Sequence, residues 1–214
     1  VFWQVDISGR VRTGKVMLYN PENGRRIKEP HNYITWVHSI LKKENFHLRQ
    51  CLFGEHLLSS DQQRPVALVE SEKSALISSF YLPQYLWIAS GGKNGAFNRN
   101  AMSVLRNRRV LLFPDLGATD YWNSKMEMIR SLGIEVSLFD FMKKNATKEE
   151  RDAGYDIADF LLREETKEAI FNRLITLNPA LKTLVDTFDL QLVNVEKASL
   201  SATVQRTRKG LFKR

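Results

Sequence analysis

The chain has 214 residues, and its 43% hydrophobic and 26% charged residues are typical of a folded globular protein. Its longest apolar runs, such as Val110–Phe113, are too short to cross a bilayer, and no signal peptide is visible. The low cysteine content suits a reducing compartment, so we expect a cytoplasmic protein. Cys51 is the only cysteine, which excludes an internal disulfide and a cysteine-based zinc site. Because the chain starts at Val1 rather than Met, we expect it to be a piece of a longer protein.

The net charge of +8 is unevenly distributed along the sequence. Residues 1–65 carry 10 Lys/Arg against 6 Asp/Glu, residues 66–196 carry 16 against 18, and residues 197–214 carry 6 against none. Basic flanks around a mildly acidic middle suit a polyanion held beside an acidic, metal-dependent centre. A basic surface that only aids solubility is an equally open interpretation.

The first 64 residues predict a β-rich, basic segment. Strands are expected over residues 2–7 and 11–19, with a turn at Ser8-Gly9 and a second turn over residues 20–24. A short helix is expected over residues 35–43. The basic side chains that could contact nucleic acid here are Arg10, Arg12 and Lys15.

After Arg64-Pro65 the pattern changes to alternating strands and helices. Strands are expected over residues 66–69, 85–89, 109–113 and 134–138, and helices over residues 71–80, 100–106 and 120–132, the last closed by Gly133. Continuous apolar strands separated by helices predict an α/β fold, in which a mostly parallel sheet has helices on both faces.

Helices dominate from Thr147 onward. The segment Thr147–Glu150 resembles a capping box, helices are expected over residues 156–162 and 166–177, and Asn178-Pro179 is expected to end the last one. We therefore expect four parts, which are 1–64, an α/β domain over 65–165, a helical segment over 166–196 and a disordered basic tail over 197–214.

Three predicted strands end in residues that suggest chemistry. Glu70 follows the first, Ser90-Gly91-Gly92 the second, and Asp115 the third. Because ligands bind beyond the carboxyl ends of parallel strands, we expect Glu70 and Asp115 to face one crevice with the glycine turn between them. Two carboxylates suit Mg²⁺ or Mn²⁺, glycines allow close approach of phosphates, and Lys73 and Lys93 could add positive charge.

These motifs resemble those of the toprim domain of bacterial and mobile-element primases. Residues 66–75, 86–92 and 110–118 resemble its three strand motifs, the last being the Asp-x-Asp motif, and residues 154–161 resemble the Asp-rich segment that follows it. Residues 5–11 and 50–54 are similar to the small subdomain that precedes toprim in primases. The resemblance covers residues 66–165 and implies a Rossmann-like fold, with Glu70 as general acid or base.

The sequence departs from the toprim pattern at Gly117, where the family has a second acidic residue. Asp120 could replace that metal ligand, or it could simply be the charge at the start of a helix. Purely structural roles also stay open for other acidic residues. Asp115 could serve to form a turn and nothing more. Glu72 is more typical of a helix first turn than of a ligand, and Asp156 is more typical of a helix cap. The four histidines fit no metal pattern, so we expect packing or surface roles for them.

The resemblance implies a primase-like protein that binds single-stranded DNA and nucleotides and performs Mg²⁺-dependent nucleotidyl transfer during replication of a mobile element, with a helicase or other replication proteins as partners. Gly117 leaves the enzymatic activity open. The alternative is an inactive toprim module for DNA binding or protein docking. A third interpretation is a fragment of a toprim nuclease or topoisomerase.

Overall fold

The computed structural model describes residues 1–42, 44–92, 97–163 and 167–191. The chain divides into two compact units, Val1–Arg163 and Glu164–Arg214. The expected basic tail, residues 197–214, lies outside the described residues.

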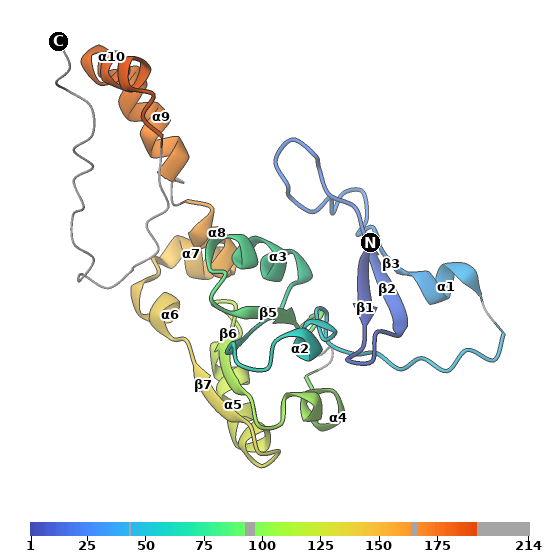
Figure 1. Ribbon diagram of the computed structural model, residues 1–214. Helices are drawn as coiled ribbons and strands as arrows, with labels where there is room; N and C mark the ends of the chain where they lie inside the picture. Colours follow the sequence, from blue (N-terminus) through green and yellow to red (C-terminus); the bar gives the residue numbers. More distant parts are fainter. Residues whose placement is uncertain (43, 93–96, 164–166, 192–214) are drawn as a thin grey trace, which may run out of the picture. The chain divides into compact units, whose positions relative to one another are not determined.

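A three-stranded antiparallel sheet opens the first unit, in the order β1-β2-β3 (Figure 1). Its strands are β1 (Phe2–Val5), β2 (Val11–Met17) and β3 (Ile34–Trp36). The start of the helix expected over residues 35–43 is wrong, because Thr35 and Trp36 pair with Val16 and Lys15 of β2, and helix α1 spans only Val37–Leu41. Pairing with a strand distant in sequence overrides a weak local preference for helix.

A second sheet has four parallel strands in the order β5-β4-β6-β7. Figure 1 labels β5, β6 and β7 of this sheet. Its strands are β4 (Val66–Val69), β5 (Leu86–Ala89), β6 (Arg109–Phe113) and β7 (Glu135–Leu138). Every residue of β4 and β5 is buried, as expected for strands covered on both faces. The prediction of a parallel α/β sheet is therefore confirmed.

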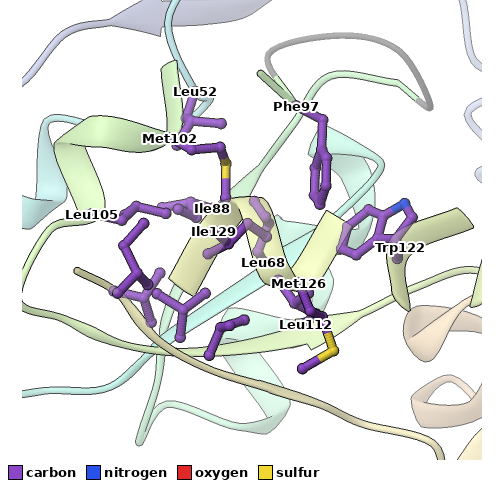
Figure 2. Close-up of a cluster of buried hydrophobic side chains, with 14 of the residues drawn as sticks. Leu52, Leu68, Ile88, Phe97, Met102, Leu105, Leu112, Trp122, Met126 and Ile129 are labelled. Atoms are coloured by element: carbon purple, nitrogen blue, oxygen red, sulfur yellow. The ribbon is translucent and has the colours of Figure 1, made fainter. Parts of the chain in front are cut away.

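Helices cover both faces of this sheet because successive strand residues point to opposite sides. Leu68 packs in one cluster with Trp122 and Ile129 of α5 (Thr119–Arg130), beside Met102 and Leu105 (Figure 2). The opposite face packs Ala67 and Val69 against helices α3 (Glu72–Tyr81), α6 (Phe141–Asn145) and α8 (Ile157–Leu161). The remaining short helices of this unit are α2 (Leu57–Ser60), α4 (Arg99–Met102), the 3-10 turn η1 (Ser103–Leu105) and α7 (Lys148–Ala153).

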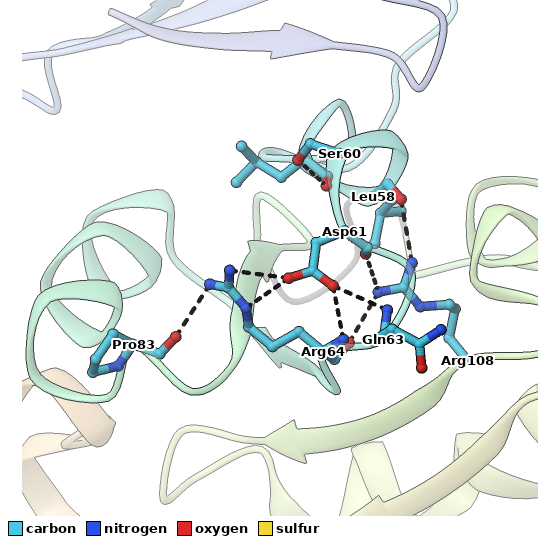
Figure 3. Close-up of polar contacts among 8 residues, drawn as sticks. Leu58, Ser60, Asp61, Gln63, Arg64, Pro83 and Arg108 are labelled. Carbon is cyan, nitrogen blue, oxygen red and sulfur yellow. Dashed lines mark hydrogen bonds and ion pairs between the residues drawn. The ribbon is translucent and has the colours of Figure 1, made fainter. Parts of the chain in front are cut away.

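Arg108, just before β6, fixes the segment that leads into the parallel sheet (Figure 3). Its guanidinium donates to the carbonyl oxygens of Leu58, Asp61 and Arg64 at 3.3, 2.8 and 2.9 Å. The Asp61 carboxylate in turn accepts from Arg64 Nε at 3.0 Å. These bonds hold the chain between α2 and β4 against the sheet.

The expected helix ends are largely confirmed. Thr147 and Glu150 form the capping box of α7, and Asp156 caps α8 through the backbone N–H groups of Ala158 and Asp159. Gly133 has a φ of 77° and closes the turn after α5.

The second unit contains α9 (Lys167–Leu177) and α10 (Pro179–Phe188). Asn178 ends α9 as expected, but its side chain also caps α10, with Pro179 at the first helical position. Among the described residues, no helix is long and apolar enough to cross a membrane.

Candidate functional site

Glu70 and Asp115 follow two strands that are direct neighbours. β4 and β6 pair in parallel with Val69 opposite Phe113, so both carboxylates lie at the same carboxyl edge of the sheet. The glycine turn follows β5, which pairs with the other side of β4, so it does not lie between the two carboxylate-bearing strand ends.

Within the described residues, the carboxyl group of Asp115 lacks a hydrogen-bond donor at one of its oxygen atoms. Its Oδ1 atom is buried and has no hydrogen-bond partner among the described residues. Burial raises the pKa of Asp115 to about 8, with further contributions from the negative charges of Glu70, Asp156 and Asp159. Such a carboxyl group binds a proton at neutral pH unless a cation replaces the proton.

Asp156 connects the loop around Asp115 to helix α3. Its Oδ2 atom accepts a short hydrogen bond from the hydroxyl of Ser74, while Oδ1 caps α8. The backbone N–H of Leu116 also donates to the carbonyl of Tyr155 at 3.0 Å. Burial raises the pKa of Asp156, although the hydrogen bond from Ser74 opposes this shift. The interpretation of Asp156 as a helix cap is confirmed, and its charge additionally acts on Asp115.

Asp120 does not join this pair. Its side chain is 91% exposed, and its Oδ1 atom lies 2.7 Å from Lys143 Nζ. In the part of the chain that the structure describes, no three His, Cys, Asp or Glu side chains are grouped to hold a metal ion. The expected ligand set of Glu70, Asp115 and Asp120 is therefore not assembled, and Asp120 acts as a charge in the first turn of α5.

A divalent ion can still be accommodated by fewer protein ligands. Mg²⁺ commonly keeps several waters and binds through one or two carboxylates together with substrate phosphates. The unpartnered Oδ1 of Asp115, beside Glu70, provides a donor set of this kind. The residues present thus fit a metal ion held by few protein ligands rather than one held in a closed protein cage.

The glycine turn after β5 depends on backbone conformations that favour glycine. Gly91 and Gly92 have φ angles of 80° and 137°, and the Gly91 N–H donates to the carbonyl of Glu70 at 3.0 Å. A Cβ atom on Gly91 would lie 3.3 Å from Glu72 Oε1, whereas one on Gly92 would meet nothing within 4 Å. With respect to the described residues, Gly92 therefore presents open backbone, while Gly91 is packed. Lys93 lies outside the described residues.

Glu72 is buried, which its position in a helix first turn does not predict. It is 2% exposed, and its Oε2 atom accepts from Lys15 Nζ at 3.2 Å. Lys15 also donates to the carbonyl of Gly91 at 2.9 Å. Lys15, expected to contact phosphate, is thus committed to protein acceptors beside the glycine turn. The sequence does not predict this contact, because Lys15 and Glu72 are 57 residues apart in the chain.

The other expected basic contacts lie elsewhere. Lys73 donates to the carbonyl of Gly24 at 3.4 Å and lies over the ring of Tyr19. Arg10 and Arg12 both bind the carboxylate of Asp6. The hydrogen bonds that these three side chains make within the described residues thus go to Asp6 and Gly24.

The side chains of Cys51 and His38 are placed for packing rather than for catalysis or metal binding. Cys51 is buried, and this burial, with the charges of Glu55 and Asp6, raises its pKa to about 12. His38 bonds Thr13 Oγ1 at 2.8 Å and stacks on Phe46. The packing role expected of the histidines is therefore confirmed for His38, and Cys51 is a buried free cysteine.

Comparisons with known proteins add a family match. Residues 1–116 match the family model described as a domain of unknown function, DUF6371. No curated protein matches the chain. A crystal structure of the Aquifex aeolicus primase, containing zinc-binding and RNA polymerase domains, is similar with a TM-score of 0.45 and 15% identity, over 88% of this chain and 51% of that one. The chain thus spans about half the length of that primase fragment.

Proposed function

The chain belongs to the DUF6371 family, and from that premise we propose that it is a primase-like nucleic-acid protein with a toprim domain over residues 65–165. In this proposal residues 1–64 form the preceding subdomain, and Glu70 and Asp115 hold Mg²⁺ or Mn²⁺ for nucleotidyl transfer in primer synthesis. The toprim motifs of the sequence, rather than any match to a protein of known activity, support this proposal.

The observation that carries the proposal is the buried, unpartnered Oδ1 of Asp115 next to Glu70 at the carboxyl edge of two paired strands. A buried carboxylate is costly unless it is protonated, hydrogen-bonded or paired with a cation. A divalent ion would supply that charge and offset the negative charge of the reacting phosphate oxygens.

The chain's own residues have separate roles in this scheme. Asp115 must release its proton before it can act as a ligand, since its pKa lies near 8. Glu70 would accept the proton of the attacking hydroxyl group, as the toprim resemblance implies. The open backbone at Gly92 leaves room for a phosphate to approach the turn after β5.

Single-stranded DNA and nucleotides are the proposed partners, with a helicase or other replication protein of a mobile element in the cytoplasm. The positively charged N-terminal segment supports the nucleic-acid part of this proposal, because binding to phosphates is dominated by Lys and Arg contacts.

The second candidate function is an inactive toprim module for DNA binding or docking. Gly117 favours it, because the position where the toprim pattern has an acidic residue is exposed and carries no side chain. Asp120, which could have compensated, is paired with Lys143 instead.

Calorimetric titration with Mn²⁺ tests the metal site directly. We expect binding in the wild-type protein, loss of binding in Glu70→Gln and Asp115→Asn, and no change in the matched control Asp120→Asn. Absence of Mn²⁺ or Mg²⁺ binding at millimolar concentration would refute the catalytic proposal. A primer-synthesis assay beside a DNA-binding assay then separates the two functions: DNA binding that survives chelation of metal, without synthesis, supports the inactive module.

A further inference from the structure

A cavity of about 190 Å³ lies beside the turn between β1 and β2, and its lining includes neither Glu70 nor Asp115. Three arginines line it, together with two acidic residues and polar side chains of α4 and η1. The charged lining residues are Arg10, Arg12, Arg49, Asp6 and Glu55.

Asp6 orients two of these arginines. It is 5% exposed, and its Oδ2 atom accepts from Arg10 Nε at 3.0 Å and from Arg12 Nε at 2.8 Å. The terminal nitrogens of Arg10 have no hydrogen-bond partner among the described residues, and 66% of this side chain is exposed. A buried carboxylate therefore holds both guanidinium groups in place while most of the Arg10 donors remain unused.

Arg49 supplies a guanidinium group that is entirely unpaired. It is exposed, and it makes no hydrogen bond or ion pair with any described residue. An arginine that lines a cavity without a protein acceptor offers five N–H donors to a ligand.

The acidic residues of the lining are already committed to other donors. Glu55 accepts from the backbone N–H groups of Ile7 and Leu52, at 3.0 and 3.2 Å. Asp6 additionally accepts from the N–H groups of Ser8 and Arg10. Three arginines against two carboxylates leave the lining with a formal charge of +1, and the charged donors without an acceptor among the described residues belong to Arg10 and Arg49. The cavity is therefore complementary to an anion.

The size of the cavity limits what this anion can be. Pockets for whole drug-sized ligands occupy about 300–1,000 Å³, so a cavity of about 190 Å³ holds a single group rather than an entire nucleotide. Guanidinium groups match phosphate oxygens in geometry as well as in charge. We infer that this cavity binds one phosphate group, supplied either by a nucleotide or by the backbone of a nucleic acid.

Titration with inorganic phosphate in buffer containing a chelator, followed by ³¹P line broadening, tests this inference without a divalent metal. Each variant removes a charge-assisted contact, so we expect Arg49→Gln and Arg10→Gln each to weaken phosphate binding by about tenfold or more. Arg49→Gln is the cleaner variant, because Arg49 makes no hydrogen bond or ion pair within the described part of the chain that its replacement would break. Arg130→Gln, at an exposed position outside the cavity lining, removes the same charge and should leave binding unchanged.

Two further ligands identify the source of the phosphate group. If a nucleotide supplies it, nucleoside triphosphate binding falls in Arg49→Gln; if a backbone supplies it, binding of a short oligothymidylate falls instead. No phosphate binding at millimolar concentration, or equal weakening in Arg130→Gln, would overturn the inference. Asp115→Asn should keep phosphate binding, so failure of the metal site and failure of this cavity are distinguishable.

Discussion

Lys15 of β2 and Glu72 of α3 form an ion pair with only 12% and 3% of their side chains exposed, Lys15 Nζ lying 3.2 Å from Glu72 Oε2. The pair ties the antiparallel sheet to the helix that directly follows Glu70. It also places Lys15 against the carbonyl of Gly91, so three segments distant in sequence meet at this point.

Replacing Lys15 by Met should destabilise the protein strongly. The change leaves the Glu72 carboxylate buried without its cation, which typically costs about 3–5 kcal/mol of unfolding free energy. Urea unfolding measures this loss. The control is Lys144→Met, which removes the exposed pair with Asp140 and should cost about 0–1 kcal/mol. Equal effects of the two substitutions would show that the Lys15–Glu72 pair does not stabilise the fold.

Stability should fall as pH rises through the titration range of Asp115. Its pKa is raised from 3.8 to about 8 by burial and by the charges of Glu70, Asp156 and Asp159. Between these two values the unfolded chain has lost the proton while the folded protein keeps it, so the free energy of unfolding decreases until about pH 8 and then levels off. Urea midpoints measured from pH 5 to pH 9 should show this decrease.

The variant Asp115→Asn should lose this component of the pH dependence and become more stable than the wild type at pH 9. Asp120→Asn serves as the control, since Asp120 is exposed and should leave the slope unchanged. A pH dependence of stability that is the same in Asp115→Asn and in the wild type would contradict the assignment.

Gly117→Asp should be tolerated and should strengthen divalent-metal binding. A Cβ atom at this exposed position meets nothing within 4 Å, so an Asp side chain fits without strain. The added carboxylate restores the acidic residue that the toprim pattern has here, and each additional carboxylate raises affinity for a hard cation. Mn²⁺ titration should give tighter binding in Gly117→Asp than in Gly117→Asn, which has similar size but no charge. Equal affinities would argue against a metal site at this edge.

Arg108→Lys should lower stability by about 1–3 kcal/mol, because a lysine cannot reproduce the planar fork that reaches three carbonyl groups. Thermal or urea unfolding checks this value. The neighbouring Arg109→Lys, at an exposed position, provides the matched control and should change stability by about 0.5 kcal/mol or less. If both variants behave alike, the Arg108 bonds do not anchor the segment before β4.

Much of the architecture could be predicted from local patterns. The apolar runs at residues 66–69 and 110–113 lie in strands as expected, since continuous hydrophobicity is typical of strands that are covered on both faces. The helix caps at Thr147 and Asp156 could also be predicted, because capping depends on residues only three positions apart. The positions of Glu70 and Asp115 at strand ends follow from the same patterns.

What the sequence determined by itself was the set of strands and helices and the carboxylates at their ends, because these depend on periodicity within a few residues. Only the tertiary structure decided the strand order, which places the glycine turn on the far side of β4 from Asp115. It also decided that Asp120 is exposed and that Glu72 is buried against Lys15, 57 residues away in sequence. Such contacts arise from the packing of segments far apart in the chain, which local spacing does not encode.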